Sequence, residues 1–108
     1  MKALSHLNSA EASKKSELLG NMKNLHEDSR IEEEDIQVVI NSNAVEMAVK
    51  SSDAEEYIIE CIENGVNFNI CSNSLKNLGI EEEELIEGLK TVESGVGTLN
   101  LLQEKGYN

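Results

Sequence analysis

Gly65-Val66-Asn67-Phe68-Asn69-Ile70-Cys71-Ser72-Asn73-Ser74-Leu75 is the stretch on which the fold of the chain depends. In its first part, apolar residues alternate with two asparagines, which is the period-two pattern of a β-strand. Three residues that are favourable helix N-caps follow Cys71, and apolar residues recur just beyond them. The pattern predicts a strand over residues 66–71 that is followed at once by a helix.

Cys71 is expected where the carboxyl end of a strand meets the amino end of a helix, which is where ligands and chemistry gather in open α/β sheets. Unpaired N–H groups and the helix dipole favour negative charge there, so the thiolate is stabilised relative to the thiol. A cysteine in this position can be a nucleophile near neutral pH. The alternative is a packing residue, because free cysteine is among the most frequently buried residue types. Both interpretations remain open at the level of the sequence.

Strands and helices also alternate along the rest of the chain. The most strand-like segment is Ile36-Gln37-Val38-Val39-Ile40, whose nearly continuous apolar character is typical of a strand covered on both faces. Further strands are predicted over residues 2–7, 66–71 and 90–92, and helices over residues 10–28, 44–49, 54–64 and 97–105, with a helical turn over 82–89. Another helix is predicted after the N-cap candidates at residues 72–74, with Leu75, Leu78 and Ile80 on its apolar side. Alternation of this kind indicates parallel strands, right-handed crossovers and helices on both faces of the sheet. We therefore predict an α/β fold, a three-layer α/β/α sandwich with a mostly parallel sheet of four or five strands, as a single domain over residues 1–108.

Individual residues are also expected to mark where helices begin and end. Residues 51–53 are expected to cap the helix over 54–64, and Gly65 to end it in the left-handed conformation. In the last helix, Leu99 and Leu102 are expected to point inward, together with Val96. The tail over residues 106–108 either pairs with the sheet or extends freely.

Composition excludes several classes of function. The formal net charge is −12, from 9 basic and 21 acidic residues, and such a surface repels nucleic acid and anionic membranes. The acidic runs over residues 32–35 and 81–84 are interpreted as solvated turns and first helical turns rather than as a metal site. No apolar run is long enough to span a membrane, and the amino terminus lacks the features of a secretory signal, so we expect a cytoplasmic protein.

Cysteines and glycines give no metal or phosphate motif. Cys61 and Cys71 are ten residues apart, without the spacing of a zinc site or a disulfide framework, and Cys61 falls on the apolar face of a helix as an inert core residue. Gly95-Val96-Gly97 is interpreted as a tight turn, because no Gly-rich phosphate loop is present. We expect no metal and no organic cofactor.

The turns that follow parallel strands meet at one edge of the sheet. This edge is expected to collect His6, the turn Asn41-Ser42-Asn43, the segment Cys71-Ser72-Asn73, and Ser94 with Gly95. Cys71 is the candidate catalytic residue and the others are candidate binding residues. His6 is a candidate base or ion-pair partner for the thiol, or else a histidine at a strand end with no catalytic duty.

Several segments together resemble the DsrE/DsrF-like family. The stretch over residues 65–80 is similar to the family pattern G-V-x-h-x-h-C-x-N-T-L-x-x-x-G-I, where h is apolar. The segment Val92-Glu93-Ser94-Gly95-Val96 and the tail Leu102-Gln103-Glu104-Lys105-Gly106-Tyr107 also resemble family segments, so the likeness is strongest in the carboxyl half. Residues 41–43 depart from relatives that carry a glycine in this turn.

The resemblance implies an α/β/α sandwich, usually assembled as a homotrimer or a trimer-based homohexamer. It also implies a sulfur relay, in which the family's persulfide-carrying cysteine corresponds to Cys71. The leading hypothesis is thus a sulfur carrier that uses donor and acceptor proteins as partners, with Ser72, Asn73 and their N–H groups stabilising the thiolate. The alternative is a non-catalytic oligomeric module that binds a small ligand or a partner. A flavodoxin-like nucleotide binder is disfavoured by the missing phosphate loop and the negative charge.

Overall fold

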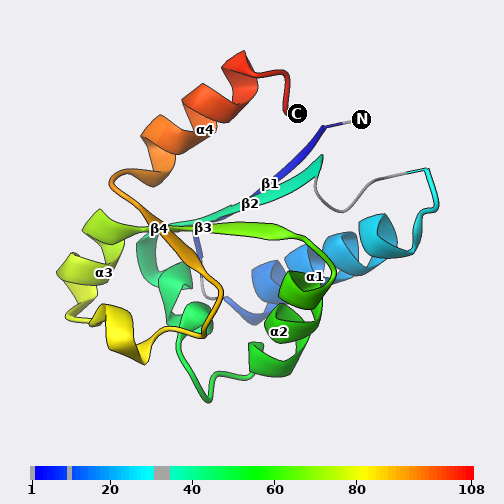
Figure 1. The fold of residues 1–108 in the computed structure, drawn as a ribbon. Coiled ribbons are helices and arrows are strands. Elements are labelled where there is room, and N and C mark those ends of the chain that lie inside the picture. Colours follow the sequence, from blue (N-terminus) through cyan, green and yellow to red (C-terminus); the bar gives the residue numbers. More distant parts are fainter. Residues whose placement is uncertain (1, 10, 31–34) are drawn as a thin grey trace.

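The computed structural model describes residues 2–9, 11–30 and 35–108, which form a three-layer α/β/α sandwich (Figure 1). In the described residues the central sheet has four strands, all parallel, in the spatial order β1-β2-β3-β4. The strands are β1 (Ala3–Leu7), β2 (Ile36–Ile40), β3 (Asn67–Cys71) and β4 (Lys90–Val92). The predicted fold class and the parallel arrangement are confirmed.

Helices cover both faces of this sheet (Figure 1). On one face lie α1 (Ala12–Glu27), α2 (Glu55–Glu63) and the 3-10 helix η2 (Ser42–Ala48). On the other face lies α4 (Gly95–Glu104), whereas α3 (Ser72–Leu78) continues from the carboxyl end of β3. A single 3-10 turn, η3 (Glu82–Glu84), precedes β4. Residue 10, where the first helix was expected to begin, and residues 32–34 of the first acidic run lie outside the described residues.

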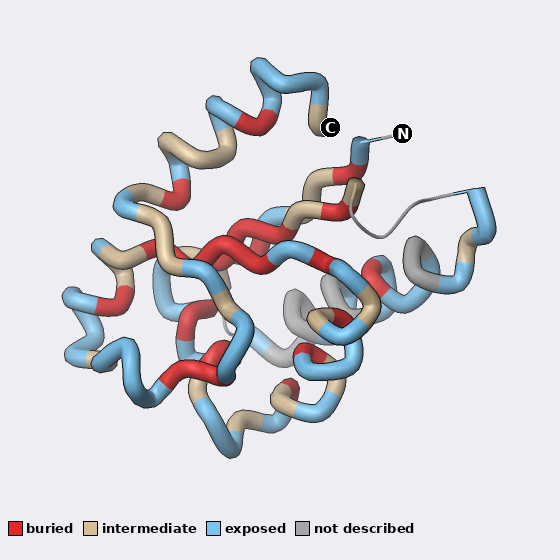
Figure 2. The backbone as a smooth tube through the Cα atoms, in the orientation of Figure 1, coloured by how far each residue is buried: buried red, intermediate tan, exposed pale blue. Residues whose placement is uncertain are grey.

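The hydrophobic core is centred on β2 (Figure 2). Ile36, Val38 and Ile40 are fully buried against the layer that contains α1 and α2. Val39 is also fully buried, and because side chains alternate along a strand it faces the opposite layer, which contains α4. The expectation that β2 is covered on both faces is confirmed.

Asn69 is a polar residue inside the layer that α4 covers. It is 2% exposed, although polar residues of an alternating strand ordinarily face solvent. Its side-chain amide donates to Gln37 Oε1 and to the carbonyl oxygen of Val38, both at 3.0 Å. These bonds compensate for the loss of water around the amide, which explains how β3 accommodates it.

Helix starts are where the sequence-based expectations were wrong. Helix α3 begins at Ser72, so the N-cap is Cys71 and not one of the three residues after it. Helix α2 has Ala54 as its N-cap, without a side-chain capping bond, so residues 51–53 do not cap it. The turn expected at residues 41–43 and the helix expected at 44–49 form one 3-10 helix, η2. Gly65 has a φ of 92°, which confirms the left-handed helix end.

The carboxyl-terminal region also departs from expectation in detail. Helix α4 begins at Gly95, two residues early, because the Ser94 hydroxyl accepts a hydrogen bond from the Gly97 N–H at 3.1 Å. Leu102 is buried as expected and Leu99 is half-buried, but Val96 is 60% exposed, so the expectation that it points inward was wrong. Within residues 82–89 only η3 is helical.

The carboxyl-terminal tail pairs with β1. The Leu4 N–H donates to the carbonyl oxygen of Asn108 at 2.9 Å, and the Asn108 N–H donates to the carbonyl oxygen of Lys2 at 3.1 Å. The two ends of the chain therefore lie side by side (Figure 1). Among the helices of the described residues, none has the length and apolar character needed to cross a membrane.

Candidate functional site

The carboxyl ends of the parallel strands bring the predicted turns together at one edge of the sheet. Cys71 at the end of β3 is paired in register with Val92 at the end of β4. The Asn41 N–H, just after β2, donates to the carbonyl oxygen of Leu7 at the end of β1, at 3.0 Å. The sheet therefore positions the turns after all four strands along a common edge.

Cys71 lies within a set of polar donors at this edge. The residue is 5% exposed. Burial raises the pKa of its thiol, but the Ser74 hydroxyl and the N–H groups of Ser74, Gly95 and Asn73 outweigh burial, so that the pKa lies below its ordinary value. The thiol makes no side-chain capping bond to α3, so the donors act together rather than through one short contact. The thiol is therefore buried beside groups that favour the thiolate.

Ser74 is a functional candidate that the sequence analysis treated only as a helix cap. The Ser42 N–H, from the turn after β2, donates to Ser74 Oγ at 2.8 Å. Because Oγ accepts this bond, its own proton is free to point to the Cys71 sulfur. The signal in the sequence was the spacing, since the third residue of a helix faces the N-cap residue.

Asn41 connects His6 to the Gly95 side of the site. The His6 Nε2–H donates to Asn41 Oδ1 at 3.0 Å. A Cβ on Gly95 would lie 3.0 Å from Asn41 Cβ and 3.2 Å from its Nδ2, so Asn41 packs directly on the glycine. His6 thus lies against Asn41, while the groups that lower the pKa of Cys71 come from other residues. This arrangement favours the interpretation of His6 as a strand-end histidine over that of a base.

The remaining predicted residues surround this centre. Ser42 has a φ of 54°, in the left-handed region that favours glycine, and its N–H is held by Ser74. Asn43 is exposed and half-buried Ser72 borders a shallow depression with Leu75 and Lys76. Ser94 caps α4 and so fixes the start of the helix whose Gly95 N–H faces the thiol.

Cys61 is in a different environment. It is 3% exposed on the core side of α2, and burial raises the pKa of its thiol. The expectation that Cys61 is a buried core residue is confirmed. No group of three or more metal-ligating side chains occurs in the part of the chain that the structure describes.

An all-parallel sheet between layers of helices, with a cysteine at the junction of β3 and α3, places this protein among the three-layer α/β proteins. The family model described as the DsrE/DsrF-like family matches residues 2–108, so the chain belongs to that family. None of the proteins in a curated set matches it.

Solved structures share this fold. A protein of unknown function, MTH1491 from Methanobacterium thermoautotrophicum, is 30% identical, with a TM-score of 0.90 over 98% of this chain and 94% of its own. The ychN protein from E. coli is 13% identical, with a TM-score of 0.73 over 99% and 97% of the two chains. BT1422 from Bacteroides thetaiotaomicron, also of unknown function, is 14% identical, with a TM-score of 0.75 over 96% and 90%. The last two show a common fold alone.

Proposed function

We propose that this protein is a sulfur carrier that holds a persulfide on Cys71. The observation that carries the proposal is the set of donors around the thiol, because these donors lower its pKa in spite of burial. Membership of the DsrE/DsrF-like family supports the same chemistry. The proposal requires no metal and no organic cofactor.

Loading is a thiol exchange that needs no external oxidant, because the Cys71 sulfur is oxidised to the same extent as the donor's inner sulfur is reduced. The Cys71 thiolate attacks the outer sulfur of a donor persulfide, R–S–SH, the bond between the two donor sulfurs breaks, and R–S⁻ leaves. The product is Cys71 with one additional sulfur, Cys–S–SH. The donors at Ser74, Gly95 and Asn73 favour this step by keeping a fraction of the thiol ionised.

In delivery of the sulfur, the Cys71 sulfur is the leaving group rather than the nucleophile. An acceptor thiolate attacks the outer sulfur, and the Cys71 sulfur leaves as a thiolate. A leaving thiolate of lower pKa departs faster, and the donors that surround Cys71 are already placed for that anion. The same polar groups therefore assist loading and release. The small exposed fraction of Cys71 favours a narrow donor, such as the end of a persulfide or polysulfide.

Mass spectrometry of the intact protein after incubation with a persulfide donor tests the proposal. The wild type should gain the mass of one sulfur atom, and a reducing agent should remove it. Cys71→Ser should abolish the gain, whereas Cys61→Ser, the matched control, should retain it. Equal gain in Cys71→Ser, or no gain in the wild type, would contradict the proposal.

We also propose that the protein works as a homo-oligomer, a trimer or a hexamer. This proposal rests on the family resemblance, and the exposed apolar side chains Val96 and Leu101 on α4 are compatible with it. Light scattering at micromolar concentration should give a mass of three or six chains. A monomer under these conditions would refute the proposal without affecting the sulfur chemistry.

A further inference from the structure

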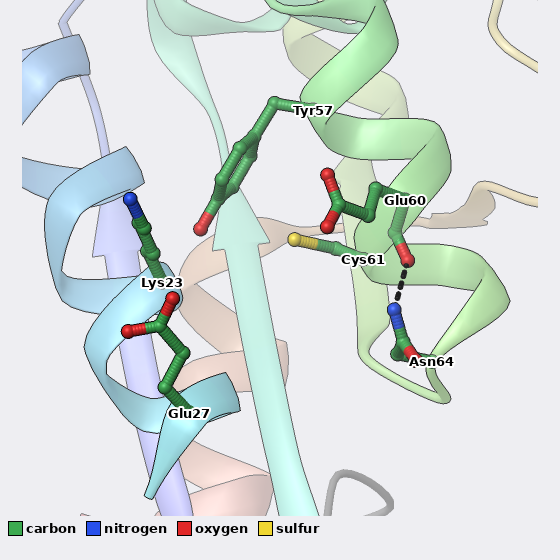
Figure 3. Close-up of a pocket in the computed structure, with 6 residues that line it drawn as sticks. All are labelled: Lys23, Glu27, Tyr57, Glu60, Cys61 and Asn64. Atoms are coloured by element: carbon green, nitrogen blue, oxygen red, sulfur yellow. Dashed lines mark hydrogen bonds between the residues drawn. The ribbon is translucent and has the colours of Figure 1, made fainter.

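A cavity of about 260 Å³ lies between α1 and α2 (Figure 3). It belongs to the layer opposite α4 and is therefore separate from Cys71 (Figure 1). A water molecule takes up about 30 Å³ in the liquid, so the cavity has room for a small metabolite of several non-hydrogen atoms. Its lining residues are Lys23, Glu27, Tyr57, Glu60, Cys61 and Asn64.

Most residues that line the cavity carry polar or charged groups, although the contact between two helices on a sheet is ordinarily apolar. Lys23 and Glu27 are four residues apart and thus share a face of α1. The other four lining residues recur at a spacing of three or four along α2 and just past its end, so they also share a face. Figure 3 shows Tyr57, Glu60 and Cys61 pointing from α2 toward α1, whereas Lys23 and Glu27 lie along α1. The Asn64 amide donates to the carbonyl oxygen of Glu60.

The floor of the cavity is more buried than its rim, where Lys23, Glu27 and Glu60 are exposed. Cys61 is 3% exposed and Tyr57 is half-buried, and the Tyr57 hydroxyl interacts with the Cys61 thiol. The pKa of Tyr57 is raised by burial first, and then by Cys61, Glu60 and Glu27. Carboxylates from both helices therefore act on the same phenol.

The charged side chains of the cavity are available to a ligand. In the part of the chain that the structure describes, Lys23, Glu27 and Glu60 form no ion pair within 4 Å. Two carboxylates and one ammonium group thus line a cavity of small-molecule size. Their charge complement is a molecule with two ammonium groups and one carboxylate.

We propose that the cavity between α1 and α2 binds a basic amino acid, of the diamino-acid class of lysine. Glu27 and Glu60 each receive an ammonium group, and Lys23 receives the carboxylate. The ring of Tyr57 offers a face for one cation. A metal ion is a poorer occupant, because the described residues hold no group of three ligating side chains.

Titration of the full chain with L-lysine at physiological salt tests the proposal, with amide NMR shifts and calorimetry as readouts. We expect saturable binding, with shifts confined to α1, α2 and their contacts. L-norleucine, which has the same length but lacks the second ammonium group, should bind roughly tenfold more weakly, since a charge-assisted hydrogen bond is lost. L-glutamate should not bind, because of its charge.

Single substitutions distinguish specific binding in this cavity from the general attraction of cations to an acidic protein. Glu60→Gln should weaken L-lysine binding roughly tenfold. Lys23→Met should weaken the binding of L-lysine but not that of cadaverine, which lacks the carboxylate. Glu56→Gln is the matched control, because this exposed glutamate is also on α2 but does not line the cavity. No binding at millimolar L-lysine, or equal effects of Glu56→Gln and Glu60→Gln, would overturn the proposal.

Discussion

The Ser42 N–H donates to Ser74 Oγ over 2.8 Å, and this bond joins the turn after β2 to the first turn of α3. Ser42 reaches that position with a φ of 54°, a conformation that costs a non-glycine residue free energy. Because Ser74 Oγ accepts this bond, the hydroxyl proton remains available to Cys71, and the hydroxyl lowers the pKa of that thiol. Two turns that are distant in sequence therefore act on one sulfur atom.

Removal of the Ser74 hydroxyl should make the Cys71 thiol less acidic. Ser74→Ala deletes a donor to the thiolate, so the pKa of Cys71 should rise and the rate of its alkylation by iodoacetamide near neutral pH should fall roughly tenfold, since hydrogen bonds to charged groups contribute about 1.5–3 kcal/mol. Ser72→Ala is the control, because Ser72 is the neighbouring helix residue and the donors to Cys71 are at Asn73, Ser74 and Gly95. Equal rates for Ser74→Ala and the wild type would show that the hydroxyl has no such role.

The two glycines at the start of α4 should respond differently to alanine. A Cβ on Gly95 would lie 3.0 Å from Asn41 Cβ, so Gly95→Ala must displace Asn41 or the helix, at a cost of about 1–3 kcal/mol in unfolding free energy. It should also slow Cys71 alkylation, because the Gly95 N–H moves with the backbone.

A Cβ on Gly97 would meet Ser94 Cβ at 3.5 Å, an ordinary contact. Gly97→Ala should therefore be neutral or should stabilise the protein by up to about 1 kcal/mol, since alanine is the better helix former. Urea unfolding measures both variants, and an equal loss of stability in the two would refute the packing argument.

Much of the fold was predictable because its strands are short and strongly patterned. β2 was predicted with its observed bounds since its apolar, β-branched residues have no competing helical period. Helix starts were predicted less well, because several adjacent residues could serve as N-cap. The choice was made by tertiary contacts, such as that of Ser74 with Ser42 across the sheet edge.

The candidate site was predictable as a location but not as a mechanism. Parallel topology alone places Asn41 near Gly95 and Cys71 near both. Ser74, and not Ser72, supplies the hydroxyl because the helix begins one residue after Cys71. The contact of His6 with Asn41 depends on side-chain conformation, which no sequence pattern specifies.

Asn69→Asp should make folding strongly pH-dependent. The Asn69 amide donates to Gln37 Oε1 and to the Val38 carbonyl oxygen. Gln37 can turn its NH₂ group to a carboxylate but the Val38 carbonyl cannot, so the buried charge is disfavoured and the pKa of the new aspartate should be raised. Stability should then fall as pH rises from about 3.9, where the unfolded aspartate ionises, to the raised folded value.

Near neutral pH we expect Asn69→Asp to be about 3 kcal/mol less stable than the wild type, as measured by urea unfolding across this pH range. Asn67→Asp, on the same strand but exposed, should change stability by no more than about 0.5 kcal/mol. A loss of stability that does not vary with pH would indicate altered packing rather than a buried charge.

The two cysteines should differ in their dependence on pH although they are about equally accessible. Cys71 and Cys61 are 5% and 3% exposed, but the pKa of Cys71 is lowered by its donors in spite of burial, and burial raises that of Cys61. Iodoacetamide should therefore modify Cys71 first near neutral pH, and the rate for Cys71 should reach its plateau at lower pH, as followed by peptide mass mapping. In denaturing urea both thiols should titrate near 8.5.

The lowered pKa of Cys71 should also make the stability of the protein depend on pH. Because its pKa is lower in the folded state, the wild type should gain stability relative to Cys71→Ala as pH rises from the folded value to the ordinary one. That gain should be lost as pH falls through the folded value. Identical alkylation profiles for the two thiols in the native protein, or earlier modification of Cys61, would show that the donors around Cys71 do not favour its thiolate.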